Sequence, residues 1–207
     1  ICASINDEVV HGIPSADRIL QAGDLVSIDA GAIIDGWNGD SAISVVVPGG
    51  DPKISAARER VSRVTEMSLW HGIAALAKGK RLNDVGVAIE KYVNSQGKFG
   101  ILEQYVGHGI GRSMHEDPPV FNYAVRGLTP KIVPGLVVAI EPMVTAGTEI
   151  TKVLDDDWTV STIDGSDASH WEHSIAVHSG GIWVLTAPDG GAAELAKLGV
   201  TVAPLGD

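Results

Sequence analysis

Two neighbouring stretches near the start of the chain are rich in apolar and β-branched residues, and a short polar turn separates them. They cover residues 25–34 and 37–47, with Asp35-Gly36 between them. An Asp-Gly pair accepts the positive φ angles that a tight hairpin turn requires. The pattern therefore predicts an antiparallel hairpin that turns at these two residues.

Helical spacing follows the hairpin. Asp51-Pro52 is typical of a helix start, because Asp caps the first free backbone N–H groups and Pro fits the first helical position. Apolar residues three or four apart over 54–67 predict a helix that Gly79 ends. A second helix is expected over residues 83–95.

The later part of the chain predicts strands over residues 135–145, 169–178 and 182–185, and a glycine-rich loop at 107–111. Helices and strands do not alternate in regular β-α-β units. The predicted fold class is therefore α+β, not a doubly wound parallel sheet.

Composition fits one ordinary globular domain, since 44% of the 207 residues are hydrophobic. We expect this domain over residues 1–186, followed by a low-information C-terminal tail at 187–207. No apolar run approaches the roughly 20 residues of a membrane-spanning helix, and no secretory signal is visible. The single cysteine, Cys2, cannot form an internal disulfide and fits a reducing compartment. We expect a cytoplasmic protein.

The formal net charge is −11. Nucleic-acid binding needs clustered Lys and Arg, so DNA is a poor candidate partner. An acidic chain suits cationic ligands better, either metal ions or a substrate with a free amino group. Surface acidity that serves only solubility would explain the same number.

The hairpin places two acids on one face. Pairing through the turn sets Asp29 opposite Ala42 and Gly31 opposite Asp40, and side chains alternate faces along a strand. Asp29 lies in an apolar stretch, and the hairpin contains no Lys or Arg. A buried carboxylate without a partner is costly, so an external cation is its natural partner. The alternative is a pair of ordinary strand-edge acids. A one-residue slip in register would also place one Asp on the other face of the hairpin.

Three further residues have metal-ligand chemistry. His108 lies between glycines, Glu141 ends an apolar run, and Glu172 begins another. Taken alone, a histidine such as His108 is more often structural than a ligand, and for each Glu a structural role is at least as consistent. With the two hairpin acids they offer four carboxylates and one imidazole, a set that suits Mn²⁺, Fe²⁺ or Co²⁺ and tolerates Zn²⁺. Four carboxylates balance two divalent ions, as in two-metal hydrolases.

The order and spacing of these residues, with their neighbours, resemble the pita-bread metalloenzymes, and within them the type I methionine aminopeptidases. The matching motifs span residues 2 to about 178 and are Ser4-Ile5-Asn6, Val9-Val10-His11-Gly12-Ile13-Pro14, Asp29 with Asp40, Gly107-His108-Gly109-Ile110-Gly111, His115-Glu116, Ile140-Glu141-Pro142-Met143 and Glu172-His173. Two departures are visible. Val10 stands where the family often has cysteine, and the family chain normally begins some tens of residues earlier.

The resemblance implies a curved antiparallel sheet covered by helices, with two divalent ions (Co, Mn, Fe or Zn) bound within it. Asp29 would chelate one ion, and His108 and Glu141 would bind the other. Asp40 and Glu172 would bridge the pair.

The resemblance also implies catalytic and substrate-binding roles. Glu141 would carry the proton from the attacking water to the leaving amine. His115 would hydrogen bond the scissile group, and His11 would contact the substrate backbone. Cys2 and Trp158 would line a pocket for a methionine side chain, since soft sulfur and an aromatic wall suit a thioether.

The implied activity is removal of the initiator methionine from nascent proteins and peptides, with a preference for a small second residue. A hydroxide held between the two ions would attack the first peptide bond. Nascent polypeptide N-termini beginning with Met would be the partners, with transient contact to the ribosome and none to DNA or membranes.

Alternatives remain at this stage. Prolidases and X-prolyl aminopeptidases share the five ligands, although His11-Gly12-Ile13-Pro14 favours a methionine aminopeptidase. Type II enzymes carry a long insertion between the last two Glu ligands, which here are only 31 residues apart. A non-enzymatic pita-bread binding module is the third alternative, but such relatives typically lose metal ligands.

Overall fold

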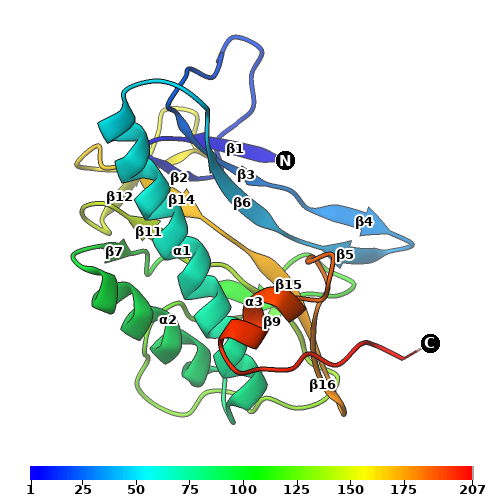
Figure 1. The fold of residues 1–207 in the computed structure, drawn as a ribbon. Helices are drawn as coiled ribbons and strands as arrows, with labels where there is room; N and C mark the ends of the chain where they lie inside the picture. Colours follow the sequence, from blue (N-terminus) through cyan, green and yellow to red (C-terminus); the bar gives the residue numbers. More distant parts are fainter. Residues whose placement is uncertain (207) are drawn as a thin grey trace.

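The structure, a computed structural model, describes residues 1–206 (Figure 1). Along them the elements follow in the order β1 (Cys2–Ile5), β2 (Glu8–Val10), β3 (Leu25–Asp29), β4 (Ala32–Ile34), β5 (Trp37–Gly39), β6 (Ala42–Val46), α1 (Pro52–Lys78), α2 (Asn83–Gln96), β7 (Gly100–Ile101), β8 (Gly107–Gly109), β9 (Glu116–Val120), β10 (Val137–Ile140), β11 (Met143–Thr145), β12 (Thr151–Val153), β13 (Val160–Thr162), β14 (Ala168–His170), β15 (His173–His178), β16 (Gly181–Val184) and α3 (Ala192–Lys197).

The strands form short antiparallel sheets. The largest has the order β16-β15-β10-β8-β9, and three-stranded sheets have the orders β1-β3-β6, β14-β11-β7 and β12-β13-β2. The hairpin β4-β5 projects from the body of the molecule (Figure 1). Every strand pairing is antiparallel. Along the chain the helices do not alternate with the strands in β-α-β units. The predicted α+β class is confirmed.

The two long helices begin and end close to the predicted positions. The Asp51 carboxylate accepts hydrogen bonds from the backbone N–H groups of Lys53 and Ile54, and α1 runs until Gly79. In Figure 1, α1 lies across the strands with α2 beside it. Their apolar faces share one core with β10, β15 and β16, and its fully buried members include Leu69, Ile73, Ile89, Val138, Ile140 and Ile175. Neither helix is long and apolar enough to span a membrane, nor is any other described helix.

Four segments predicted as continuous strands are interrupted, and this expectation was wrong. The breaks separate β3 from β4, β5 from β6, β10 from β11 and β14 from β15. One of the four predicted acidic ligands lies at or beside each break. At the third break the strands change partners: β10 pairs with β15 and β8, whereas β11 pairs with β14 and β7. Pro142 follows Glu141 there, and proline has no N–H for a ladder hydrogen bond.

The glycine-rich segment is a strand, β8, and not the predicted loop. Its glycines are explained by close packing. A Cβ atom on Gly107 would lie 2.3 Å from the Ala139 carbonyl oxygen, and one on Gly109 would lie 2.3 Å from that of Asp117. Glycine therefore lets neighbouring backbones approach His108 from both sides.

The segment after residue 186, expected as a tail, packs on the same core as the rest of the chain. Leu195 of α3 is fully buried. The Ala203 backbone N–H donates to the Ile182 carbonyl at 3.1 Å, and the His178 Nε2 atom lies 2.9 Å from the Ala203 carbonyl oxygen. Asp207, the last residue of the expected tail, lies outside the described residues.

Candidate metal centre

The acidic hairpin has the predicted register. Asp29 pairs with Ala42 across β3 and β6, and Ile34 pairs with Trp37 at the turn. Carboxylate oxygens of Asp29, Asp40 and Glu172 lie within 4.8 Å of one another. The hairpin therefore supplies two acids to one point, and the break before β15 supplies the third.

Reciprocal hydrogen bonds join the segments that carry Asp40 and Glu172. The backbone N–H of Glu172 donates to the Ala42 carbonyl at 2.9 Å, and the Ser41 hydroxyl donates to the Glu172 carbonyl at 3.0 Å. The Ser174 hydroxyl donates to the Asp40 carbonyl at 2.8 Å and accepts from the Asp40 N–H at 3.2 Å. Backbone groups left free by the strand breaks are thus satisfied, and the two acids are fixed relative to each other.

His108 and Glu141 form the other side of the cluster. His108 Nε2 lies 3.4 Å from Glu141 Oε1, and one ligand atom from each of His108, Glu141 and Glu172 falls within a 4.8 Å group. His108 Nδ1 lies 2.9 Å from the Gly109 carbonyl oxygen. A carbonyl oxygen only accepts, so Nδ1 carries the proton and Nε2 presents a lone pair to the cluster. Such a carbonyl contact is the usual means of orienting a metal-binding histidine.

The acids lie in an environment that disfavours their charges. Burial, and next the charge of Asp40, raises the pKa of Asp29 to about 6. Burial also raises the pKa of Glu141 and of Glu172 well above the ordinary value, with the neighbouring carboxylates adding to the effect.

No Lys or Arg of the described residues forms a salt bridge with any of these acids, and the buried Oε1 atom of Glu172 has no hydrogen-bond partner there. Clustered hard oxygens, one imidazole lone pair and an orphaned carboxylate oxygen fit divalent cations.

The remaining predicted site residues lie around this cluster. The ring centroids of His115 and His108 are 4.4 Å apart. The His11 ring stacks on Trp158 at 5.3 Å, and burial lowers the pKa of His11, with the nearby His115 adding to the effect. Cys2 pairs with Asp29 across β1 and β3. All nine predicted residues are therefore in one region.

His11 has an unusual backbone conformation, with φ at 65°. Left-handed φ values are uncommon for residues other than glycine and often occur at functional sites. Gly12 follows, and a Cβ atom there would lie 2.3 Å from the Ala3 carbonyl oxygen. The His-Gly pair thus turns the imidazole toward Trp158 while the backbone passes close to β1.

Sequence reasoning missed three residues of this region. The Tyr105 ring meets the edge of His11 at 5.5 Å, and the buried Asn122 side chain donates to the Glu141 carbonyl at 3.1 Å. His170 Nε2 lies 3.6 Å from Glu141 Oε2, and burial lowers the pKa of His170 to about 3. A histidine two positions before Glu172 in a buried strand was a usable signal. Tyr105 and Asn122 gave none, because only the fold brings them near the site.

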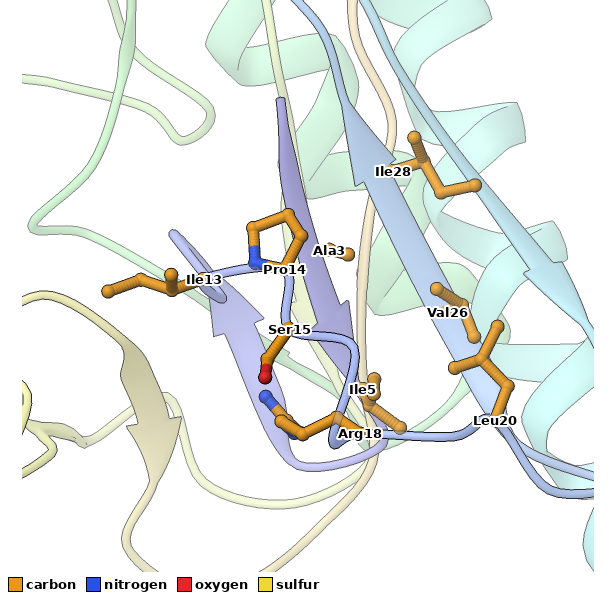
Figure 2. Close-up of a pocket in the computed structure, with 9 residues that line it drawn as sticks. All are labelled: Ala3, Ile5, Ile13, Pro14, Ser15, Arg18, Leu20, Val26 and Ile28. Carbon is orange, nitrogen blue, oxygen red and sulfur yellow. The ribbon is translucent and has the colours of Figure 1, made fainter.

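A separate apolar groove of about 200 Å³ lies on the face of the β1-β3 pair that is opposite to the side chains of Cys2 and Asp29 (Figure 2). Its floor includes Ala3 and Ile5 of β1, which alternate in direction with Cys2 and Ser4. None of the nine predicted site residues lines it. The groove is therefore distinct from the predicted methionine pocket, and the pocket role of Cys2 and Trp158 stays a prediction.

Comparison with known proteins agrees with this geometry. The sequence model of metallopeptidase family M24 matches residues 1–179, and the chain belongs to this family of metal-dependent peptidases.

Within the family the chain is similar to methionine aminopeptidases. It is 53% identical to methionine aminopeptidase 1 of Mycobacterium tuberculosis over 194 residues, which cover 90% of this chain and 70% of the relative. It is 44% identical to methionine aminopeptidase 1 of Bacillus subtilis over 186 residues, which cover 90% of this chain and 73% of the relative.

Solved structures of methionine aminopeptidases are also similar to this chain. The methionine aminopeptidase of Thermotoga maritima superposes with a TM-score of 0.83 at 40% identity, covering 89% of this chain and 72% of that one. The prolidase of Pyrococcus furiosus superposes with a TM-score of 0.66 at 20% identity, covering 90% and 48%. At that identity the prolidase shows only the shared fold, which confirms the expected pita-bread architecture.

Replacement of one acid tests whether the cluster is built for cations. A buried acid whose pKa is raised by folding stabilises the protein below its unfolded-state pKa, and that contribution is lost as pH rises through the folded-state pKa. Glu172→Gln should therefore melt at or above wild type in chelator at pH 7.5, by ~2–4 °C for each kcal/mol of repulsion relieved. With Mn²⁺ added, it should lose most of the metal-induced rise in Tm that wild type shows.

Glu8→Gln is the matched control, because Glu8 is also buried but pairs with Arg18 at 2.9 Å. This control should lower Tm without metal and keep the metal-induced rise. If Glu172→Gln also melted several degrees below wild type without metal, or kept the full metal-induced rise, the cation-site interpretation would be wrong.

Proposed function

We propose that this chain removes the N-terminal methionine from peptides and newly made proteins, with a preference for a small second residue. The observation that carries the proposal is the convergence of Asp29, Asp40, His108, Glu141 and Glu172 from separate segments of the chain. The relatives named above are methionine aminopeptidases, and they support the same activity. The matched region covers all nine predicted site residues.

The residues present fit two divalent ions. Asp29 would hold one ion, His108 and Glu141 would hold the other, and Asp40 and Glu172, which each belong to more than one group of neighbouring ligand atoms, would contribute to both. Mn²⁺, Fe²⁺, Co²⁺ or Zn²⁺ would suit this donor set. When bound, such ions supply Lewis acidity and a water molecule of lowered pKa.

Glu141 is the residue we assign to proton transfer. Its carboxylate lies in the cluster beside His108 and Glu172, within reach of the place where the attacking water would be held, and a proton carrier must first meet this geometric condition. Glu141 would accept the proton of the attacking water at a carboxylate oxygen and give it to the leaving amine. A glutamine at this position could keep the shape of the side chain but could not carry the proton.

The histidines beside the cluster would bind the substrate. His115 lies in the turn before β9, next to His108, where an imidazole N–H can donate to the scissile carbonyl and stabilise the charge that develops there. His11, stacked on Trp158, would contact the substrate backbone. Cys2 and Trp158 would form the walls for the methionine side chain.

Acidity should also help to select the substrate. Carboxylates around the cluster attract a free N-terminal amino group, and the net charge of −11 does not suit nucleic acid. The partners would be nascent chains that begin with Met. The enzyme would bind them in the cytoplasm during transient contact with the ribosome.

Peptide cleavage tests the proposed specificity. With Mn²⁺ or Co²⁺ present, the chain should release Met from Met-Ala-Ser and should leave an X-Pro peptide intact. Thorough chelation should abolish the release, and added metal should restore it. Cleavage of the X-Pro peptide alone would favour a prolidase-type activity, and turnover that survives chelation would exclude the metal mechanism. Chromatography of the reaction products measures cleavage of each peptide, with and without chelator.

Glu141→Gln tests the proton carrier. The variant should fold, with a far-UV spectrum like that of wild type, and should lose at least ~100-fold in kcat, within the usual effect of a general acid–base group. Glu66→Gln on the surface of α1 is the matched control and should keep wild-type kcat. Normal turnover by Glu141→Gln would refute the assigned role.

A further inference from the structure

His170 is a buried histidine to which none of the roles described above has been assigned. It is the last residue of β14, two positions before Glu172, and only 2% of its surface is exposed. Its Nε2 atom has no hydrogen-bond partner among the described residues. The nearest charged group is Glu141, whose Oε2 atom lies 3.6 Å away. An unpartnered polar atom at this depth is unusual and calls for an explanation.

Buried hydroxyl groups hold the backbone of this histidine. The His170 N–H donates toward the hydroxyl oxygens of Ser44 at 3.1 Å and Ser27 at 3.2 Å, and the Ser44 hydroxyl donates to the His170 carbonyl at 2.8 Å. Ser27 and Ser169 also hydrogen bond the Ser44 hydroxyl, at 2.7 and 2.9 Å. The end of β14 is thus fixed by its backbone, and the imidazole is left directed at Glu141.

The two oxygens of Glu141 face different histidines. Oε1 lies 3.4 Å from His108 Nε2, which presents a lone pair because its Nδ1 donates to a carbonyl. Oε2 lies 3.6 Å from His170 Nε2. A buried imidazole is neutral and carries one N–H. Once a cation has displaced any proton from Glu141, a His170 proton on Nδ1 would leave the Nε2 lone pair facing an ionised carboxylate oxygen, which it would repel.

We propose that His170 is a positioning residue that donates its Nε2–H to Oε2 of Glu141 and so leaves Oε1 free to bind the cation held with His108. This inference rests on the proposed metal site. The separation of 3.6 Å is longer than a formed hydrogen bond. Contacts of this kind are often long before ligands bind and tighten in the working complex.

Two histidines of opposite tautomer then flank one carboxylate. His108 is protonated on Nδ1 and gives a lone pair to the cation, whereas His170 is protonated on Nε2 and gives a proton to the carboxylate. Without His170, Glu141 could turn and offer either oxygen to the cation. Metal affinity at the His108–Glu141 position and the alignment of the proton carrier would fall together.

Calorimetric titration of Mn²⁺ into metal-free protein tests the proposal with three variants. His170→Phe keeps an aromatic ring without the donor, and affinity for one of the two ions should fall by ~10–100-fold, as is typical when a partner of a metal ligand is lost. His170→Gln restores an N–H donor at the end of a side chain of similar reach, and its affinity should lie within ~3-fold of wild type. kcat should follow the same order, with KM changing less.

His173→Phe is the matched control. His173 is also buried and adjoins Glu172, but its ring contacts Trp70 at 5.0 Å and its Nδ1 bonds the Thr186 hydroxyl at 2.7 Å. The control should bind both ions like wild type. Three results would overturn the proposal: wild-type affinity in His170→Phe, equal losses in the Phe and Gln variants, or an equal loss in His173→Phe.

A direct readout uses wild-type protein loaded with diamagnetic Zn²⁺, which displaces any proton from Glu141. Nitrogen–proton correlation spectra of the imidazole rings should assign the Nε2–H tautomer to His170 and the Nδ1–H tautomer to His108. An Nδ1–H tautomer at His170 would contradict the proposal, even if His170→Phe failed to fold. This result is independent of turnover, so it separates failure of the His170 inference from failure of the proposed peptidase activity.

Discussion

Several carboxyl groups converge in a poorly solvated space where no Lys or Arg of the described residues forms a salt bridge with them. Asp29, Asp40, Glu141 and Glu172 approach one another there, and burial raises the pKa of three of them. Separating such charges from water costs several kcal/mol per ion unless something compensates. Neighbouring strands could have supplied Lys or Arg, but among the described residues the salt-bridge partners of Glu141 are two histidines with lowered pKa values, and the other three acids have none. The structure is consistent with one compensating agent, a bound divalent cation.

The strand breaks follow from the same requirement. A continuous strand would spread its side chains over two faces, whereas a break lets one residue turn inward while the strands on either side keep different partners. The freed backbone groups are then satisfied locally, by the Ala42–Glu172 pair, the hydroxyl of Ser174 and the side chain of Asn122. Each acid is thus held by its main chain, and its carboxylate remains available to a ligand.

Much of this could be predicted from the sequence because it depends on local signals. The Asp35-Gly36 turn fixed the register of the hairpin and so the common face of Asp29 and Asp40. Asp51-Pro52 marked the start of α1. The strand breaks could not be predicted, because an apolar run such as residues 135–145 has the same pattern with or without a change of partner. The glycines of β8 predicted a loop, but they are required because the backbones of Ala139 and Asp117 approach them closely, and only the fold shows these contacts. His170 became informative only when its distance to Glu141 was known.

We propose that these acids form a site for two divalent cations, and the proton balance of metal binding tests this site most directly. Carboxyl groups with raised pKa values hold protons that a cation must displace. Titration of Mn²⁺ into metal-free wild-type protein, repeated in buffers of different ionisation enthalpy, measures both the number of ions bound and the number of protons released. We expect two ions for each chain, with proton release at pH 6 that diminishes as the pH is raised. Absence of saturable binding, or binding without proton release at pH 6, would contradict a site for two cations.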